Sequence, residues 1–381
     1  MDDVVVVGAS LAGVSTAIQL RRLGHGVTLL DRATFPRRKA CGEGLFPVGV
    51  AALRELGDFD SLIEVGAPLQ GVRFNAARAR ATASLGEEPG LGIRRERLDA
   101  ALVQAAIDAG VHLRTGTTVT GLQLRAGRVA AVNTADGPVQ ARAFVAADGL
   151  HSPLRRMAGL DGAIGTRYGV TAHVLLQRQP EPLVDIFFER GYELYLTPVG
   201  GCSANVALLL RKPQMHPFAG RVREAFIEHL QRHPAFAAGF TLEDAPMVAG
   251  PFRRRCRRAW RANLLLVGDA AGFYDGISGE GMSAALAAGP MAAHALHHYL
   301  ATGSYGPFRA YEAERMALVR NSDLLAKVSL ALSRNQAVAR YAVGNLARRP
   351  ETFARLVAIS SGTAPLATLR ARDLVALATG L

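Results

Sequence analysis

The chain has 381 residues, 49% of them hydrophobic and 20% charged, which is enough for two or three domains with large apolar cores. Its formal net charge is +12, but it contains only three lysines, so the positive charge is almost entirely arginine. The arginines are mostly scattered without interleaved aromatic residues, which argues against nucleic-acid binding. The three cysteines lie far apart, which excludes a disulfide framework and a four-cysteine iron–sulfur cluster within this chain.

The N-terminal residues follow the pattern of a dinucleotide-binding βαβ unit. Four consecutive valines at 4–7 predict a strand buried on both faces, residues 14–23 predict an amphipathic helix, and residues 27–30 predict a second buried strand. In such a unit the glycines let the backbone approach a pyrophosphate, and a carboxylate after the second strand binds a ribose hydroxyl. The matching positions are Gly8, Ser10, Gly13 and Asp31, with Ser10 in place of the middle glycine.

Because this unit begins at residue 4, the sequence predicts no signal or transit peptide, and no apolar run reaches transmembrane length. We therefore expect a cytoplasmic protein. Contact between the alanine- and leucine-rich tail and a membrane surface is the less favoured alternative. The sequence leaves the oligomeric state open.

Further segments predict more of the same ligand-binding edge. Residues 93–99 open a helix, and the apolar runs 143–147 and 264–267 predict buried strands, the second followed by small residues that start a helix. A further small-residue helix is expected to begin at 278–282. Carboxylates at strand ends and helix N-termini occupy ligand-binding positions in open α/β sheets. The strand-end carboxylates are Asp148, followed by Gly149, and Asp269, preceded by Gly268.

These motifs, in this order, resemble the FAD-dependent family that contains the geranylgeranyl reductases and the para-hydroxybenzoate-hydroxylase-type, or group A, flavin monooxygenases. The resemblance covers almost the whole chain and implies tightly held, non-covalent FAD. It implies the α/β class, with a discontinuous, glutathione-reductase-like Rossmann FAD-binding domain, a β-sheet substrate domain and a helical C-terminal tail. The residues that the resemblance assigns to cofactor binding are Gly8, Ser10, Leu11, Ala12, Gly13, Asp31, Arg32, Arg38, Cys41, Gly42, Arg95, Asp148, Gly149, Gly268, Asp269, Gly279, Glu280, Gly281 and Met282.

Within this resemblance, Arg95 matches an arginine that contacts the cofactor, and Asp269 faces the ribityl and pyrophosphate region. The helix that begins after Gly279 lies beneath the pyrimidine edge of the flavin, where its N–H groups and dipole stabilise negative charge. The sequence contains no second dinucleotide fingerprint. We therefore expect NADPH or NADH to bind transiently at the flavin face, or an external reductase to reduce the FAD.

Residues 39–45, 192–198 and 348–366 look most similar to the geranylgeranyl-reductase branch of this family. Two positions depart from that branch. Gly276 stands where the branch has the proline of an Asp-Pro pair, and Tyr195 stands where it has a tryptophan. Both positions border flavin or substrate in the family, so the substrate stays open.

The chain is expected to pass repeatedly between two domains. The segments expected to build the FAD-binding domain are 1–70, 92–165 and 255–305. The segments expected to build the substrate sheet are 71–91 and 166–254, with strand-like runs at 185–188, 192–196 and 205–210 and one helix near 218–231. Residues 306–381 predict a helical tail.

Three residues are candidates for catalysis. Cys41 lies in a glycine-rich loop near the expected flavin and is a candidate proton donor, with a role as a small apolar filler equally favoured. Glu43 is a candidate substrate-side acid, although loop glutamates are usually solvated. Tyr195 is expected to line the substrate pocket together with Tyr192, with ordinary sheet packing as the alternative.

No metal site is expected. His294, His297 and His298 have helical spacing but no acidic or cysteine partner nearby in sequence, so a helix surface is preferred. The arginine-rich run 253–258 predicts a solvated loop. The alternative is that it attracts an anionic substrate or a substrate-carrying partner.

The sequence favours NAD(P)H- and oxygen-dependent monooxygenation, a hydroxylation or epoxidation, of a mostly apolar small biosynthetic intermediate. Flavin-dependent C=C reduction follows closely, because flavin chemistry belongs largely to the cofactor and leaves little trace in the protein sequence. A non-catalytic flavin-binding or carrier-docking protein is the third alternative. The intact Gly-Asp and Gly-Glu-Gly motifs argue against it.

Overall fold

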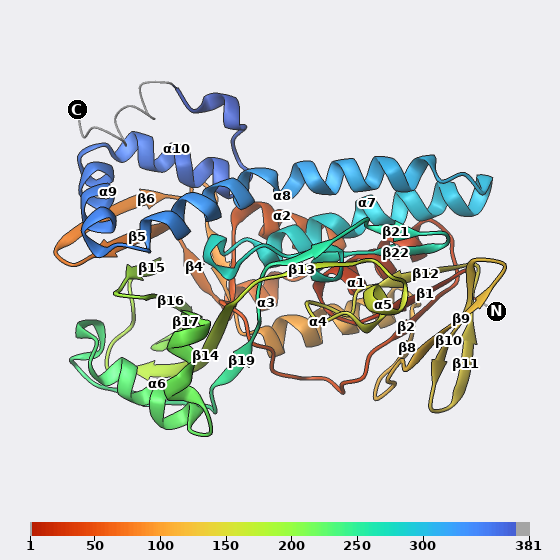
Figure 1. Ribbon diagram of the computed structural model, residues 1–381, viewed down its shortest axis with the longest axis horizontal. Helices are drawn as coiled ribbons and strands as arrows, with labels where there is room; N and C mark the ends of the chain where they lie inside the picture. Colours follow the sequence, from red (N-terminus) through yellow and green to blue (C-terminus); the bar gives the residue numbers. More distant parts are fainter. Residues whose placement is uncertain (1, 371–381) are drawn as a thin grey trace.

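The computed structural model describes residues 2–370 and contains two large sheets joined by short segments (Figure 1). The first is a six-stranded sheet in the order β21-β22-β12-β1-β2-β8, parallel except for β21. Its strands are β1 (Val4–Val7), β2 (Val27–Leu30), β8 (His112–Arg114), β12 (Ala143–Ala146), β21 (Trp260–Arg261) and β22 (Leu264–Leu266). All four valines of β1 are buried, as their unbroken apolar run predicts.

Helices α1 (Leu11–Arg22), α4 (Arg95–Asp108) and α7 (Gly281–Thr302) accompany this sheet, and α1 packs against both of the others. The predicted helix after β22 is wrong. Residues Gly268–Ala271 form only one 3₁₀ turn, η3, because Gly272 follows with a φ of +123°.

A small antiparallel sheet was not predicted. It consists of β9 (Gly121–Arg125), β10 (Arg128–Thr134) and β11 (Gly137–Gln140) and lies at one end of the molecule (Figure 1). Strands β9 and β11 contain no buried residue, and buried residues such as Val129 and Val132 come from β10 alone. A short sheet of this kind lacks the long apolar runs from which the other strands are predicted.

The second large sheet has the order β18-β14-β17-β16-β15-β5-β6, with β19 also paired to β14. Neighbouring strands are antiparallel except for the parallel pair β15 and β5. One face is covered by α6 (Val222–Gln231), the single helix expected in this region. The strands are β5 (Gly71–Ala76), β6 (Ala79–Ser84), β14 (Arg167–Leu176), β15 (Leu183–Phe188), β16 (Tyr192–Gly200), β17 (Ser203–Arg211), β18 (Phe240–Leu242) and β19 (Met247–Ala249).

Short elements connect the two large sheets. A three-stranded sheet and a two-stranded sheet bring distant segments together, and three short helices accompany them. The connecting strands are β3 (Gly44–Leu45), β4 (Ala67–Leu69), β7 (Gly90–Gly92), β13 (Asp161–Ile164) and β20 (Arg254–Cys256), and the helices are α2 (Pro47–Leu56), α3 (Asp60–Glu64) and α5 (Pro153–Met157).

The C-terminal part is helical. It contains α8 (Gly306–Leu332), α9 (Gln336–Arg348), α10 (Pro350–Ser360) and the 3₁₀ turn η5 (Leu366–Thr368). Both α9 and α10 pack on β6, at the edge of the second sheet (Figure 1). The last eleven residues of the predicted tail, 371–381, lie outside the described residues.

The predicted α/β class is confirmed, with a Rossmann-type parallel sheet, a second β-sheet domain and C-terminal helices. Within residues 2–370, no helix is both long enough and apolar enough to cross a bilayer.

Candidate active site

A cavity of about 610 Å³ lies where the two large sheets and the C-terminal helices meet. It is bordered by the start of α1, the loop 39–44, one face of the second sheet, the loop before α7 and the helices α8 to α10. This volume is within the range of small-molecule and cofactor sites.

Two glycines allow α1 to approach the end of β12 closely. Gly8 has a φ of +109°, and a Cβ atom there would lie 2.2 Å from the carbonyl oxygen of Ala147. A Cβ atom on Gly13 would lie 1.9 Å from the carbonyl oxygen of Gly8. No side chain caps the first turn of α1, and Ser10, Leu11 and Ala12 line the cavity. The start of α1 therefore offers N–H donors and a positive dipole end to an anion.

Cationic side chains accompany this helix start. Arg95 is buried, donates to Asp99 at 2.8 Å and to the hydroxyl of Ser10 at 2.7 Å, and lines the cavity. Burial opposes the charged form of Arg95, but the carboxylate of Asp99 and the thiol of Cys41 outweigh it and raise its pKa. Lys39 is a second, half-buried amine in the lining, and desolvation together with Arg95 lowers its pKa. Two cations beside a free helix start suit a pyrophosphate.

Asp31 lies directly after β2, as predicted. Its carboxylate accepts the N–H groups of Ala9 at 2.7 Å and Ala33 at 2.8 Å, which fixes its position beside the start of α1. Asp148 follows β12, and one of its carboxylate oxygens is buried without a hydrogen-bond partner among the described residues. Burial raises the pKa of Asp148. A buried acceptor without a partner is an expected feature of a site that binds a polar ligand.

The loop before α7 forms another border of the cavity. Gly279 has a φ of +72°, and the first turn of α7 has no side-chain cap. Asp275 accepts the N–H of Ile277 at 3.1 Å and pairs with Arg167 at 2.9 Å, so the loop is anchored to β14 of the second sheet. A second uncapped helix start therefore faces the cavity, as the resemblance implied.

Glu280 connects this loop to the C-terminal helices. Its carboxylate accepts a hydrogen bond from Ser360 in α10, and burial raises its pKa to about 8.

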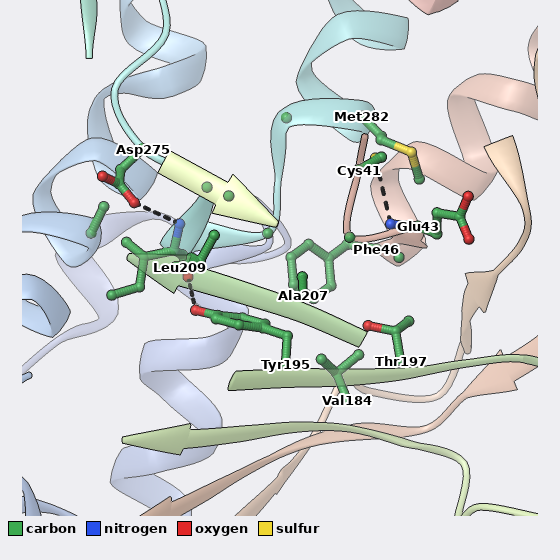
Figure 2. A pocket seen from close by; sticks show the side chains of 18 of the residues that line it. Cys41, Glu43, Phe46, Val184, Tyr195, Thr197, Ala207, Leu209, Asp275 and Met282 are labelled. Atoms are coloured by element: carbon green, nitrogen blue, oxygen red, sulfur yellow. Dashed lines mark hydrogen bonds between the residues drawn. The ribbon is translucent and has the colours of Figure 1, made fainter. Parts of the chain in front are cut away.

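The loop that carries Cys41 and Glu43 has an unexpected geometry. Glu43 is only 3% exposed, so the usual expectation of a solvated loop glutamate is wrong here. Its φ is +60°, and its N–H donates to the sulfur of Cys41 at 3.4 Å. Its carboxylate accepts the N–H of Arg95 at 2.8 Å and contacts His173, and is directed away from Phe46 (Figure 2).

The two tyrosines of β16 lie on opposite faces of the sheet. Tyr195 is on the cavity side, where its hydroxyl donates to the carbonyl of Ile277 at 2.6 Å (Figure 2). Tyr192 packs on the other side, with its ring 5.7 Å from that of His229 in α6. The prediction that both line the pocket is wrong for Tyr192, because residues three apart in a strand point in opposite directions.

The floor of the cavity is a row of side chains across four strands. Ala207, Tyr195, Ile186 and Phe74 are paired in register on β17, β16, β15 and β5. Three inter-strand steps of about 4.8 Å place Phe74 about 14 Å from Ala207. The cavity therefore extends well away from the loop before α7.

Aromatic residues and the tail helices border the distal end of this floor. The rings of Phe74 and Phe353 are 4.7 Å apart, and those of Phe74 and Phe188 are 5.2 Å apart. Phe353 lies in α10 and is 1% exposed, and Leu346 of α9 lines the same region. Phe353 lies within the segment 348–366, which resembles the geranylgeranyl-reductase branch, but no sequence pattern indicated its contact with Phe74.

Not every predicted cofactor or catalytic residue reaches the cavity; those that do are Ser10, Leu11, Ala12, Cys41, Gly42, Glu43, Arg95, Gly149, Tyr195, Gly268, Asp269, Gly279, Gly281 and Met282. Those behind the lining or away from it are Gly8, Gly13, Asp31, Arg32, Arg38, Asp148 and Glu280. Arg38 instead pairs with Asp244 at 2.9 Å, and neither Asp244 nor His173 was singled out from sequence.

The remaining predicted features lie away from the cavity. His297 contacts His25 at 2.9 Å, and Arg254, in the arginine-rich run, contacts His151 at 3.1 Å. Among the residues that the structure describes, no group of histidine, cysteine and acidic side chains has the arrangement of a metal site.

Comparison with known proteins also indicates a dinucleotide-binding site. The family model described as FAD binding domain matches residues 1–322. The menaquinone reductase of Mycolicibacterium smegmatis is 31% identical over 325 residues, which cover 76% of this chain and 75% of that protein. Digeranylgeranylglycerophospholipid reductase 2 of Methanothermobacter thermautotrophicus is 29% identical over 324 residues, 77% of this chain and 78% of that protein.

A solved structure shows the same fold. The flavin-dependent brominase Bmp2 superposes with a TM-score of 0.84 at 19% identity, covering 98% of this chain and 97% of that one. The two uncapped helix starts, the glycine contacts and the cationic side chains fit a dinucleotide cofactor, and the family match extends over most of the chain. The chain therefore belongs to the FAD binding domain family and is an FAD-dependent oxidoreductase.

Proposed function

We propose that this protein uses FAD to reduce an isolated C=C bond in an elongated, mostly apolar substrate. The observation that carries the proposal is the shape of the cavity. One continuous space joins the residues that suit the FAD pyrophosphate to an apolar floor about 14 Å long. A compact aromatic substrate would leave the distal end of this floor empty.

In this proposal, the N–H groups at the starts of α1 and α7 hold the pyrophosphate and the flavin, with Arg95 and Asp269 beside them. Bound FAD, once reduced, supplies the hydride. The chain orients the substrate, excludes water and provides the proton for the second carbon. Cys41 is the proposed proton donor, since it lines the cavity on the loop beside Arg95.

The names of the two relatives support reduction over oxygenation, because both are reductases and both match more than three quarters of this chain. Reduction was the second choice from sequence alone. We now favour it over oxygenation, and the elongated floor and the names of these relatives support that preference.

The test uses enzyme reduced by dithionite under anaerobic conditions and mixed with a menaquinone or a digeranylgeranyl lipid. We expect the flavin to be reoxidised without oxygen and the product to gain two hydrogen atoms at one C=C bond. Cys41→Ala should keep its FAD and reoxidise more slowly. Reoxidation that needs oxygen, with no hydrogenated product from either lipid, would contradict the proposal.

Oxygenation is the second candidate, and one observation favours it. Much of the lining is buried and apolar, including Leu209 and Phe252, and such a lining keeps water from reactive oxygen species. The same experiment separates the two reactions. Oxygenation predicts no anaerobic turnover and a product that contains one added oxygen atom.

A further inference from the structure

His173, in β14, lies between two carboxylates. Its Nε2 atom is 2.5 Å from Oε2 of Glu43, and its Nδ1 atom is 2.5 Å from Oδ2 of Asp244. The imidazole is 5% exposed. Carboxylates accept hydrogen bonds, so the ring donates to both partners only when both of its nitrogens carry protons. The arrangement therefore favours an imidazolium held between two carboxylates.

The cluster connects the surface with the cavity wall. Asp244 is partly exposed on the loop between β18 and β19, where it pairs with Arg38 at 2.9 Å. It also accepts the backbone N–H of His173 at 3.0 Å. Glu43, at the other end, is buried and lines the large cavity. A proton that enters at Asp244 can reach Glu43 through the two ring nitrogens.

A small, partly polar space lies beside Glu43 and His173. A second cavity of about 10 Å³, close to the volume that one water molecule needs, is lined by Glu43, His173, Thr171 and Asn205. Thr171 and Glu43 line both cavities. The hydroxyl of Thr171 donates to the carbonyl of Cys41 at 3.2 Å. Polar groups therefore extend from the surface to Glu43 in the cavity wall, and Thr171 contacts the backbone of the loop that carries Cys41.

The charges around the ring of His173 also favour its doubly protonated, imidazolium form. Burial alone would lower the pKa of His173, but its hydrogen bonds to Asp244 and Glu43 raise it to about 9. The other charged side chains around this space are those of Arg38, Lys39 and Glu96.

We propose that Asp244, His173 and Glu43 form a proton relay that resupplies the flavin end of the cavity from solvent. The inference rests on the proposed reduction, in which one alkene carbon gains a hydride and the other gains a proton. Each turnover then consumes one proton in the cavity. His173 passes its Nε2 proton toward Glu43 and regains one at Nδ1 from Asp244, which takes it from solvent. The three residues act through the donor at the cavity and do not touch the hydride.

The first experiment needs no substrate. In ¹⁵N-histidine-labelled protein, NMR should show His173 protonated at both nitrogens at neutral pH and losing a proton near pH 9. Asp244→Asn should slow exchange of the Nε2 proton with solvent at least about tenfold, because it removes the group that delivers protons. His233→Gln is the matched control, since His233 is also buried beside a carboxylate, Glu189, but is absent from the cavity lining.

The second experiment measures anaerobic reoxidation of dithionite-reduced holoenzyme by a digeranylgeranyl lipid, in H₂O and D₂O. His173→Gln and Glu43→Gln should keep FAD but slow reoxidation at least about tenfold, with a larger solvent isotope effect. Added imidazole should partly restore a His173→Gly variant, which a purely structural role does not predict.

Unchanged Nε2 exchange in Asp244→Asn would overturn the relay, whatever the substrate. Wild-type rates and isotope effects in both glutamine variants would overturn it as well. If the lipid fails to reoxidise even the wild-type enzyme while the NMR results hold, the proposed reduction fails and the solvent connection stands.

Discussion

The two ends of the cavity are built in opposite ways. At the flavin end, Arg95 contacts Asp99 and Ser10 with defined distances, and glycines bring the backbone of α1 against β12. At the distal end, Phe74 and Phe353 meet through ring contacts between segments far apart in sequence. Under the proposed function, we expect directional polar contacts to set the position of the cofactor and non-directional apolar packing to set which substrate shape fits. Changes at the two ends should therefore affect different properties.

The strongest test of this separation is Gly13→Ala. The new Cβ atom would lie 1.9 Å from the carbonyl oxygen of Gly8, so the start of α1 must move away from the turn that follows β1. We expect the purified variant to lose nearly all its FAD, measured from its visible absorbance. Gly344→Ala in α9 is the control, because a Cβ atom there has open space. A fully flavinylated Gly13→Ala protein would show that the close approach is dispensable.

Phe353→Ala should alter the distal end alone. Removing a buried phenylalanine costs about 3–5 kcal/mol of unfolding free energy. The larger space should also shift preference toward longer or bulkier apolar substrates, while FAD content stays at the wild-type level. Phe226→Ala, on the α6 side of the same sheet, should lose similar stability without a change in preference. Equal shifts in substrate preference in both variants would mean that the general loss of packing causes the shift, rather than the position of Phe353 at the cavity.

The pH dependence of stability should report on the charged cluster near the flavin end. The pKa of His173 is raised from 6.5 to about 9, so its contribution is fully present below pH 6.5 and is lost as pH rises through 9. This shift corresponds to at most about 3 kcal/mol before solvent screening reduces it. Denaturant melts at pH 6 and pH 9.5 should show this loss in the wild type. His173→Gln should show a much smaller difference.

The smallest expected effect lies between the two ends, at Tyr195. Tyr195→Phe removes the hydrogen bond to the carbonyl of Ile277 and should cost about 1 kcal/mol of stability. FAD content should be unchanged, because the lost hydrogen bond uses the carbonyl of Ile277 and none of the N–H groups assigned to the cofactor. Tyr195→Ala should raise the apparent KM for substrate, since it enlarges the floor of the cavity. An unchanged KM in the alanine variant would remove Tyr195 from the substrate surface.

The two ends also differ in how far the sequence predicts them. The βαβ unit, the strand-end carboxylates and the start of α7 rest on short local patterns, and the structure brings most of these residues to one cavity. The distal end depends on contacts between β5 and α10, which no local pattern specifies. His173 and Asp244 were not predicted for the same reason, since His173 contacts Glu43, 130 positions away, and Asp244 contacts His173, 71 positions away. In contrast, strand geometry alone predicts that Tyr192 and Tyr195 lie on opposite faces of the sheet.

The hydrogen bond between Glu280 and Ser360 has a consequence for how such enzymes diversify. The family match ends at residue 322, yet α9 and α10 supply much of the roof over the distal floor. Evolution can therefore replace the roof helices while leaving the redox half of the molecule intact, provided that the new segment again satisfies the buried carboxyl group of Glu280. The roof helices would then form a replaceable segment over the substrate, and the contact between Ser360 and Glu280 would be one of the places where a replacement must match the rest of the molecule.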